Sequence, residues 1–542
     1  MADRNIVLVG FMGSGKTVVG REVAHRLDKC FLDTDELVTR CAGMSIPRIF
    51  QEHGEAWFRE REREAVREAV SQSGTVIAVG GGAISDTENG SDNLELLRHY
   101  GFVVYLKALP ATLFQRTFHM GDRPLLDVPD RYGRIKNLLA KRELDYQEAD
   151  LVLSTDALSV ADVAQTIMRW QRGLPSGSKM VTVDLPGKKY PVIIGPGVLS
   201  EVVSLVGASI TPRAEQFFVV TDDVVNRFHG GLLLDSLKDA GFRVHVISIP
   251  PGETSKSWVQ ADRLLTWLAE KRAGRSDAIV ALGGGVVGDL AGFVASIYKR
   301  GIPIVQIPTT LLAQVDSAVG GKAGVDHPAA KNLIGSFWHP ELVVCDTDTL
   351  STLPDRELSA GLAEVVKYAV LEDPGFMGFL EREAEAILRL EPEVVISLVQ
   401  RCVRIKAEVV ALDERDTSDI RAKLNYGHTF AHALETVTNY TDFLHGEAVA
   451  IGITAAAFLS ERLTLCDGRL RERQTQLLRR FGLPTHALGV SAKSVQEAMV
   501  LDKKEGKFVM PIEEGDVVVR EADYRAVLEA IVFMTGGLDS EG

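Results

Sequence analysis

One segment near the N-terminus has the residues needed to hold a nucleotide phosphate. Residues Gly10–Thr17 read GFMGSGKT, a GxxxxGK[ST] pattern that follows the apolar run Ile6–Val9 and precedes helical spacing. In this setting, backbone N–H groups and the helix N-terminus converge on phosphate oxygens. The predicted ATP contacts are Gly13, Ser14, Gly15, Lys16 and Thr17, with Thr17 as the Mg²⁺ ligand. The alternative is a glycine-rich turn with a chance lysine.

Histidines gather in a second segment, far along the chain. His428 and His432 stand four residues apart, on one face of an expected helix. His445 follows, so that three of the 12 histidines fall within 18 residues, and Glu364 lies in a separate helical segment. Three nitrogen or oxygen ligands with an open fourth position are typical of a catalytic zinc site. Spacing alone leaves open which of these residues bind a metal, or whether they are surface histidines.

A glycine-rich turn lies between these two segments. Gly283–Asp289 contains GxGxxG directly after the apolar run Ala278–Leu282. About 20 positions further on, residues 304–308 include no acidic side chain of the kind that holds a ribose in many dinucleotide-binding folds. The turn therefore indicates some phosphate-binding loop and nothing more specific.

The elements that must position these residues fall into three parts. Residues 1–172 end at a Gly-, Pro- and Ser-containing stretch, 173–179, which reads as a linker. From 180 to 350, short apolar runs alternate with helical patterns, which predicts βαβ units and a parallel sheet. From 351 to 542, helical spacing dominates. The expected fold class is α/β: a phosphate-loop domain with a parallel sheet and helices on both faces, a second α/β domain, and a mostly helical domain.

Bulk composition excludes some classes of protein. The chain has 542 residues, is 46% hydrophobic and 25% charged, and carries a net charge of -14. Two or three domains are expected at this length, and the charge argues against a nucleic-acid binder. Five cysteines without a CxxC pair predict neither a disulfide framework nor a thiolate zinc site. Because signal-peptide and membrane-spanning patterns are not evident, we expect a cytoplasmic protein without membrane contact.

Further features of residues 1–172 carry a family resemblance. They are Asp33-Thr34-Asp35, Arg59 in GEAWFR, the run Gly80–Gly82, and Arg142 in KRELDY. Each alone has a plainer reading, as a helix cap or as part of a solvated helix face. Together with the phosphate loop they resemble shikimate kinase over nearly the whole segment.

This resemblance implies a role for each residue. Asp33 would assist Mg²⁺ and the reacting hydroxyl, Asp35 would bind the ring hydroxyls, and Gly81 would approach the ring. Arg59 and Arg142 would hold the shikimate carboxylate, which suits guanidinium groups because they bind carboxylates through two N–H donors.

The phosphate side of this site includes one more implied residue and one departure. Arg123, in DRPLL, would lie over the phosphates, so that Lys16, Asp33 and Arg123 form the implied catalytic set. Ser159 stands where the family often has an arginine near the adenine. Another small kinase, such as a gluconate- or nucleotide-kinase relative, is the alternative for this domain.

From about residue 180 to 520 the chain resembles 3-dehydroquinate synthase. The matching motifs occur in order at compatible spacing: PPGETSK at 250–256, Gly283–Asp289, Asp316–Lys322, Lys331-Asn332, Glu364–Lys367, Lys406, Arg421 and Gly427–His445. The resemblance implies that Glu364, His428 and His445 bind Zn²⁺ or Co²⁺. His432 then belongs to the substrate site.

The resemblance also implies NAD and substrate contacts. The implied NAD set is Asp222, Glu253, Lys256, Gly285, Gly288, Asp289, Thr309, Thr310, Lys322 and Lys331. The implied substrate set is Arg300, Asp316, Lys322, Asn332, Lys367, Lys406, Arg421, Asn425, His432 and either Lys503 or Lys504. Lys322 and His432 are implied as catalytic, and Arg300 as a contact supplied across a homodimer.

The family reaction explains why such residues would be needed. Its substrate, 3-deoxy-D-arabino-heptulosonate 7-phosphate, gives hydride to NAD from an alcohol polarised by the metal. It then loses phosphate, regains the hydride and closes to 3-dehydroquinate. The implied whole is a fused kinase and synthase acting on small molecules, namely ATP, shikimate and the heptulosonate phosphate. Alternatives are a polyol dehydrogenase or another sugar-phosphate cyclase in the second part, or a fusion with one non-catalytic half.

Overall fold

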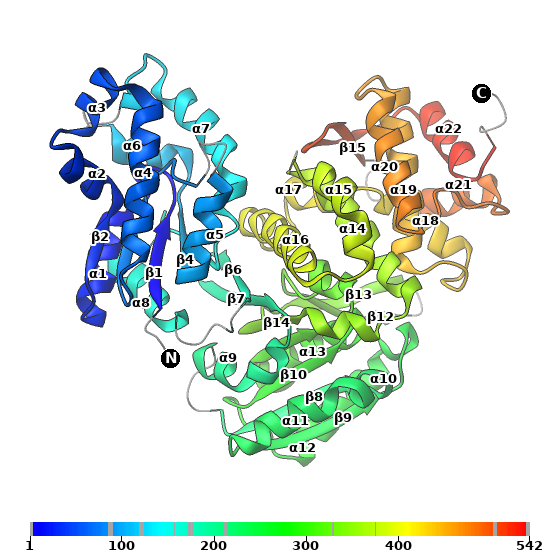
Figure 1. Cartoon of the computed structure of the whole chain (residues 1–542). Helices are drawn as coiled ribbons and strands as arrows, with labels where there is room; N and C mark the ends of the chain where they lie inside the picture. Colours follow the sequence, from blue (N-terminus) through cyan, green and yellow to red (C-terminus); the bar gives the residue numbers. More distant parts are fainter. Residues whose placement is uncertain are drawn as a thin grey trace. The chain divides into compact units, whose positions relative to one another are not determined.

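The computed structural model describes residues 4–84, 90–118, 124–156, 158–171, 175, 177–209, 214–327, 330–373, 375–501 and 507–537. Within it the chain divides into two compact units, Met1–Val181 and Thr182–Gly542 (Figure 1). The stretch expected as a linker, 173–179, ends just before this division, and Lys179 already begins a strand. Arg123, Lys503 and Lys504, which the sequence placed in the sites, lie outside the described residues.

Unit 1 contains a parallel sheet with the strand order β2-β3-β1-β4-β5. Met180 and Val181, at the start of β6, pair with β5. Buried residues make up all of β1 and β3 and nearly all of β4, as expected for strands covered on both faces. The strands are β1 (Asn5–Val9), β2 (Phe31–Asp33), β3 (Val76–Ala78), β4 (Gly101–Lys107), β5 (Leu151–Ser154) and β6 (Lys179–Leu185).

Helices surround this sheet (Figure 1). α1 packs beside α8 and α4 beside α5. The apolar faces of α4 and α5 join the inner strands in one core that includes Val7, Ile77 and Val103. The helices are α1 (Lys16–Leu27), α2 (Thr34–Ala42), α3 (Ile46–Glu52), α4 (Gly54–Val70), α5 (Gly90–Tyr100), α6 (Pro110–Thr117), α7 (Arg131–Tyr146) and α8 (Val160–Trp170).

The first half of unit 2 is a second parallel sheet, with the order β7-β14-β11-β10-β8-β9. The order reverses between β8 and β10, because β9 continues on one side of β8 while β10, β11 and β14 extend on the other. In open parallel sheets the carboxyl ends of strands at such a reversal flank a ligand crevice. The strands are β7 (Lys188–Gly195), β8 (Gln216–Asp222), β9 (Arg243–Ile249), β10 (Ala278–Gly283), β11 (Ile304–Pro308) and β14 (Leu342–Asp346).

Helix α13 is the central helix of this half. It packs against β10, β11 and an antiparallel hairpin formed by β12 and β13. The hairpin follows β11 and carries two of the lysines that the sequence singled out, Lys322 and Lys331. The remaining elements are α9 (Val202–Ser209), α10 (Asp223–Val225), α11 (Gly231–Asp239), α12 (Trp258–Glu270), α13 (Gly285–Ile297), β12 (Lys322–His327) and β13 (Ala330–Phe337).

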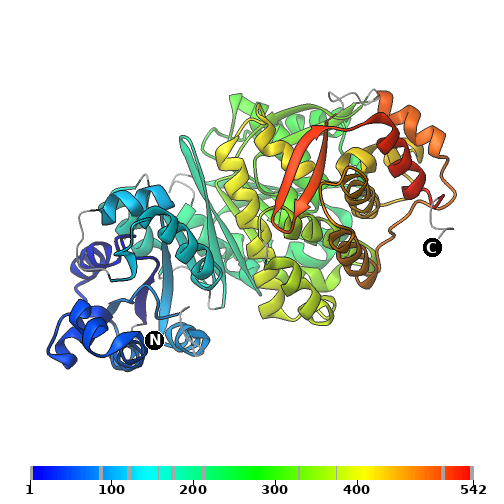
Figure 2. The same cartoon turned by 90° about the horizontal axis from the view of Figure 1, so that it is seen from above.

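The second half of unit 2 is helical, as the sequence predicted, with one added hairpin. Figure 2 shows this hairpin, β15 (Lys507–Glu513) and β16 (Asp516–Glu521), lying across the helices, and it contacts α14 and α19. In the described part of the chain, no helix has both the length and the apolar character needed to cross a membrane. The helices are α14 (Asp355–Leu371), α15 (Phe376–Leu388), α16 (Pro392–Leu412), α17 (Asp419–Ala422), α18 (His428–Val437), α19 (His445–Arg462), α20 (Gly468–Arg480), α21 (Ala492–Leu501) and α22 (Tyr524–Met534).

Candidate active sites

The phosphate loop connects β1 to α1, in the strand–loop–helix order that the sequence predicted. Gly15 precedes α1 with φ of 100°, a left-handed conformation that glycine adopts without strain. The Lys16 Nζ donates to the carbonyl oxygens of Gly10 at 2.8 Å and Phe11 at 3.0 Å. The lysine therefore lies folded over the loop, where it can move onto a phosphate oxygen.

Two aspartates meet the loop from the end of β2. The Thr17 hydroxyl donates to Asp33 Oδ2 at 2.8 Å, and the Asp35 backbone N–H donates to Asp33 Oδ1 at 3.0 Å. Asp33 thus caps α2, the plainer of its two readings, and also touches the predicted Mg²⁺ ligand. Burial, with the nearby Asp35 carboxylate, raises the pKa of Asp33. A carboxylate so placed is suited to accept a proton or share a cation.

A pocket with an empty volume of about 450 Å³ lies beside this loop. It brings together the four residues singled out as shikimate contacts: Asp35, Arg59, Gly81 and Arg142. Apolar side chains complete the wall, among them Ile46, Phe50, Phe58 and Leu125. A small polar ring bearing one carboxylate matches this combination of apolar wall and paired arginines.

The two arginines of the pocket are buried. Arg59 is 6% exposed and Arg142 is 1% exposed, so the reading of either as part of a solvated helix face is wrong. Arg142 donates to the Gly81 carbonyl oxygen at 3.0 Å and lies over the Phe11 ring. A buried guanidinium needs an anionic or carbonyl partner, and the Gly81 carbonyl oxygen is one that Arg142 has.

Glu62 is a pocket residue that sequence reasoning missed. Its Oε2 accepts from Arg59 at 2.8 Å, while Glu55 contacts the other terminal nitrogen of Arg59 at 3.0 Å. Glu62 is 2% exposed, and burial raises its pKa to about 7 in spite of Arg59. The spacing of these three residues on α4 was the available signal, since positions three and four apart on a helix are neighbours.

Ser159 has a structural task in this fold. It caps α8 in a reciprocal arrangement with Asp162, whose backbone N–H donates to the serine hydroxyl at 3.2 Å. The departure noted at this position therefore supplies a helix N-cap where the family often has an arginine.

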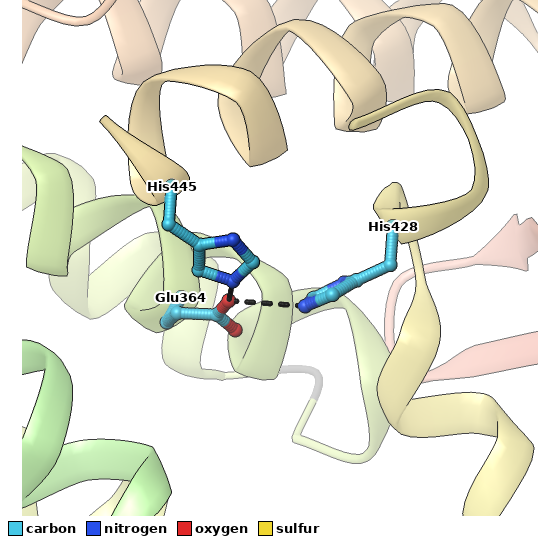
Figure 3. Close-up of side chains that lie close together, drawn as sticks. All are labelled: Glu364, His428 and His445. Atoms are coloured by element: carbon cyan, nitrogen blue, oxygen red, sulfur yellow. Dashed lines mark ion pairs between the residues drawn. The ribbon is translucent and has the colours of Figure 1, made fainter. Parts of the chain in front are cut away.

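In unit 2, three helices bring a carboxylate and two imidazoles together (Figure 3). Glu364 leaves the middle of α14, while His428 and His445 are the first residues of α18 and α19. Glu364 Oε1 lies 3.3 Å from His428 Nε2 and 3.6 Å from His445 Nε2. One ligand atom from each residue lies within 4.8 Å of the other two. The donor set and its spacing fit a divalent cation with an open coordination position.

The far nitrogens of both rings support this fit. His428 Nδ1 lies 3.1 Å from the Tyr426 carbonyl oxygen, and His445 Nδ1 lies 3.2 Å from Glu435 Oε1. When Nδ1 carries the proton donated to these oxygens, each Nε2 presents a lone pair toward Glu364. Burial lowers the pKa of His445, but hydrogen bonds to Glu364 and Glu435 outweigh it and raise that pKa to about 10.

His432 stands one helical turn after His428 and is not part of this ligand group. Its ring meets the His428 ring edge-on, with 5.7 Å between the centroids. Of the two histidines that the i, i+4 spacing singled out, only His428 therefore belongs to the ligand group.

A chain of alternating buried charges leads away from the cluster. The Lys367 Nζ lies 2.5 Å from Glu364 Oε2 and donates to Asp316 Oδ2 at 3.1 Å. Lys406 contacts Asp316 Oδ1 and donates to the Asp316 carbonyl oxygen at 2.7 Å. Burial raises the pKa of Asp316, but Lys367 and Lys406 outweigh it and bring that pKa to about 2. The ammonium groups of Lys367 and Lys406 are thus held beside the histidine cluster by the one carboxylate that they share.

The glycine-rich turn lies at the carboxyl end of β10, on one side of the strand-order reversal. Gly285 opens α13 there, and the Gly288 backbone N–H donates within that helix to Gly284. Asp222 ends β8 on the other side and caps α10 through Oδ1. Thr309 and Thr310 follow the neighbouring strand, β11. Five of the implied NAD residues thus line the strand ends where such a crevice is expected.

The other implied NAD residues form ion pairs close to the hairpin. Lys256 Nζ lies 2.5 Å from both Asp289 Oδ2 and Asn332 Oδ1. Lys331 lies 3.5 Å from Glu253 Oε1 and over the Tyr440 ring at 4.1 Å. Lys256 and Asn332 came from the two different implied sets, and the structure places them in direct contact.

The remaining implied substrate residues are less concentrated. Lys322 pairs with Asp416 at 2.6 Å on the surface. Arg421 is 2% exposed and donates to the carbonyl oxygens of Glu414 at 2.8 Å and Gly320 at 3.2 Å.

Two implied residues lie in short turns. Asn425 ends a single 3₁₀ turn (Lys423–Asn425) directly before the His428 helix. Arg300 is exposed, with φ of 69°, at the end of another (Tyr298–Arg300). A left-handed arginine is strained by roughly 1–2 kcal/mol, so the fold keeps this backbone conformation at some cost.

Comparison with known proteins decides between the readings of unit 2. Models of the 3-dehydroquinate synthase N-terminal and C-terminal parts match residues 246–360 and 361–505. The 3-dehydroquinate synthase of Desulforamulus reducens is 45% identical over 361 residues, which cover 64% of this chain and 99% of that protein. The chain belongs to the 3-dehydroquinate synthase family. The synthase of Symbiobacterium thermophilum is also 45% identical, over 62% of this chain and 95% of that protein.

Solved structures similar to the synthase part include two further synthases. A 2-deoxy-scyllo-inosose synthase, complexed with carbaglucose-6-phosphate, NAD⁺ and Co²⁺, has a TM-score of 0.59 and 25% identity, covering 65% of this chain and 99% of its own. A 2-epi-5-epi-valiolone synthase from Streptomyces hygroscopicus subsp. jinggangensis gives a TM-score of 0.59 at 24% identity, covering 65% of this chain and 97% of its own, and shows the same fold. The higher identity to 3-dehydroquinate synthases over nearly their whole length favours that activity over another cyclase.

The kinase domain precedes the synthase in the same chain. A shikimate kinase model matches residues 12–172. The protein is therefore a bifunctional enzyme of the shikimate pathway. It phosphorylates shikimate with ATP, and it converts 3-deoxy-D-arabino-heptulosonate 7-phosphate to 3-dehydroquinate and phosphate.

Proposed function

We propose that the two reactions use separate sets of residues, and that the pocket beside the phosphate loop is where shikimate is phosphorylated. ATP would bind with its phosphates on the Gly10–Thr17 loop, with Thr17 and Asp33 facing Mg²⁺. Lys16 would leave the loop carbonyls for the terminal phosphates. Backbone N–H donors and a lysine in this position stabilise the negative charge on the transferred phosphoryl group. Positioning and such charge stabilisation are most of what phosphoryl transfer requires.

Shikimate would lie between the two buried arginines. Arg59 and Arg142 bind its carboxylate, Asp35 accepts from its ring hydroxyls, and the ring rests against Gly81. The reacting hydroxyl then faces Asp33, which takes its proton as the oxygen attacks the γ-phosphorus and the bond to ADP breaks. Arg123 is proposed to contact the phosphates, on the resemblance alone.

For the synthase, we propose that Glu364, His428 and His445 hold Zn²⁺ or Co²⁺. The inosose synthase of the same fold, which binds Co²⁺ and NAD⁺, supports this assignment. When bound, the ion supplies Lewis-acid polarisation of the substrate hydroxyl that is oxidised. The protein's part is to keep both Nε2 atoms unprotonated and pointed at one position, which the Nδ1 partners accomplish.

We place NAD at the reversal of strand order in the second sheet. Gly285 and Gly288 would approach its phosphates. Asp222, at the end of β8, would supply the carboxylate that binds the ribose hydroxyls, because residues 304–308 include no acidic side chain. Lys256 and Lys331, each already paired with a carboxylate, would balance the remaining charge. Thr309 and Thr310 lie at the adjoining strand end.

The substrate would take over cations that Asp316 holds in the free enzyme. Lys367 and Lys406 both contact this one carboxylate, so two positive charges face a single aspartate here and favour an incoming phosphate or carboxylate. Arg421 donates hydrogen bonds to two backbone carbonyl oxygens. Because these partners are uncharged, they do not neutralise the guanidinium, which can also attract an anion. Lys322, His432, Asn332, Asn425 and Lys503 or Lys504 complete the proposed substrate set.

We also propose a homodimer formed through the synthase part, with Arg300 reaching the partner's substrate. The exposure of Arg300 supports this role.

All five cysteines are free thiols, in keeping with a cytoplasmic location.

The observation that carries the synthase half of this proposal is the convergence of Glu364, His428 and His445 from three helices. Lys16→Ala should abolish ADP release with shikimate and leave 3-dehydroquinate formation within twofold of the parent. His428→Ala should do the reverse. Lys29→Ala and His486→Ala, which change the same residue types outside the proposed sites, serve as controls. Loss of both activities in either folded Lys16 or His428 variant would refute the separation of the sites.

A further inference from the structure

The two proposed histidine ligands differ in what holds their far nitrogen. His428 Nδ1 faces a neutral partner, the Tyr426 carbonyl oxygen, at 3.1 Å. His445 Nδ1 faces a carboxylate, Glu435 Oε1, at 3.2 Å. Glu435 falls within the Gly427–His445 motif, but it was not among the implied site residues. The asymmetry between a carbonyl and a carboxylate therefore needs its own explanation.

Glu435 reaches His445 from a neighbouring helix. It lies on α18, two turns after His428, so the same helix face supplies one ligand and the outer partner of the other. α18 packs beside α19, which begins at His445. The Glu435 residue is only 4% exposed. A carboxylate is rarely buried to this extent unless a partner compensates it, and the His445 ring is the hydrogen-bond partner that the structure provides.

We propose that Glu435 is a positioning residue that prepares His445 to bind the metal ion. By accepting the Nδ1–H, the carboxylate selects the tautomer whose Nε2 lone pair points toward Glu364. It also fixes the plane of the ring and makes Nε2 a stronger donor, because negative charge behind an imidazole increases its basicity. This inference rests on the proposed metal centre and adds to it the residue that tunes one ligand.

The charges around Glu364 give Glu435 a second reason to be present. Lys367 lies 2.5 Å from Glu364 Oε2 and draws electron density away from that ligand. Oε1, which faces the histidines, is therefore a weaker donor than a carboxylate without such a neighbour. Glu435 acts in the opposite direction on His445, so the site keeps a lysine beside its metal-binding carboxylate without losing the ion.

A purely structural ion pair is the competing explanation. In that case Glu435 would tie α18 to α19, and its loss would lower the stability of the metal-free protein while leaving the intrinsic affinity for the ion unchanged. A positioning residue has the opposite signature: the affinity falls, and the environment of the bound ion changes.

The test measures Co²⁺ binding by the full-length protein without NAD or substrate. Glu435→Gln, Glu435→Ala and a control, Glu357→Gln, are compared with the parent by competition against a chelator. The control removes an exposed carboxylate from α14, the helix that carries Glu364. Only the Co²⁺ binding that His428→Ala eliminates is assigned to the proposed metal centre.

We expect the dissociation constant for Co²⁺ to rise about 10- to 100-fold in Glu435→Ala, the usual cost of losing such an outer partner. Glu435→Gln should lose less, because its amide oxygen still accepts from Nδ1. The visible spectrum of bound Co²⁺ should shift in both, and Glu357→Gln should match the parent in both measurements.

The inference is overturned if both Glu435 variants bind Co²⁺ within twofold of the parent with an unchanged spectrum. If Glu435→Ala does not fold, Glu435→Gln alone decides the matter by the same criteria. A parent protein without a tight Co²⁺ site would instead refute the proposed metal centre itself, which distinguishes the two failures.

Discussion

Glu62 should make the kinase unit lose stability as the pH rises, and replacing it with glutamine should remove that loss. Burial raises the pKa of this carboxyl from 4.5 to about 7. At 1.36 kcal/mol for each tenfold change in ionisation, this difference costs the ionised folded state about 3 kcal/mol.

The sign follows from which state holds the proton. Below pH 4.5 the carboxyl is protonated in both folded and unfolded chains and contributes no difference. Between pH 4.5 and 7 the unfolded chain releases the proton while the folded chain retains it, so unfolding becomes progressively easier. Above pH 7 the penalty is complete and stays constant. Glu62→Gln resembles the protonated form at every pH and should escape this trend.

The assay is the thermal unfolding of the full chain at pH 5.0 and pH 7.5 without ligand. The kinase transition is identified as the one that ATP with Mg²⁺ raises. Between these pH values the melting temperature of Glu62→Gln minus that of the parent should increase by about 5 to 10 °C, given 2–4 °C for each kcal/mol in a domain of this size.

Glu64 provides the matched control. It lies on the same helix, α4, with half of its side chain exposed and an ion pair to Arg61. Glu64→Gln should follow the parent at both pH values. If the difference between Glu62→Gln and the parent stays constant across this range, the buried pocket does not hold the proton, and the reasoning is wrong.

Three further outcomes follow from the contacts in the two sites. Arg142→Lys loses the forked donor beside Gly81, so the KM for shikimate should rise about 10- to 100-fold, as expected for a lost charge-assisted hydrogen bond; an unchanged KM in steady-state kinetics would contradict the assigned role. Lys367→Met leaves Glu364 and Asp316 without their shared cation, so the synthase transition in urea should lose about 3–5 kcal/mol, and a loss below 1 kcal/mol would count against the buried charge chain. Dialysis against a chelator followed by Mg²⁺ alone should restore phosphorylation of shikimate but not the synthase reaction, which should return only with Zn²⁺ or Co²⁺; recovery of both with Mg²⁺ would speak against the metal assignment.

Local sequence was sufficient wherever neighbouring residues make the site. The phosphate loop is built from consecutive residues between a strand and a helix, and its pattern alone predicted both the conformation and the ligand class. The division into an α/β part and a helical part was also readable, because burial imposes different periodicities on strands and helices. The motifs taken together predicted the kinase family, and the order of the motifs predicted the synthase family; both predictions are confirmed.

Contacts between distant segments were decided only by the tertiary structure. Spacing favoured His428 and His432 as a pair, yet the fold brings His445 and Glu364 to His428 because three helices meet there. The packing of α18 against α19 also places Glu435 behind His445, and in unit 1 the packing around α4 buries Glu62 together with Arg59. None of these pairings leaves a local pattern beyond ordinary helix spacing, since a side chain's charge state and partners depend on what the rest of the chain packs against it.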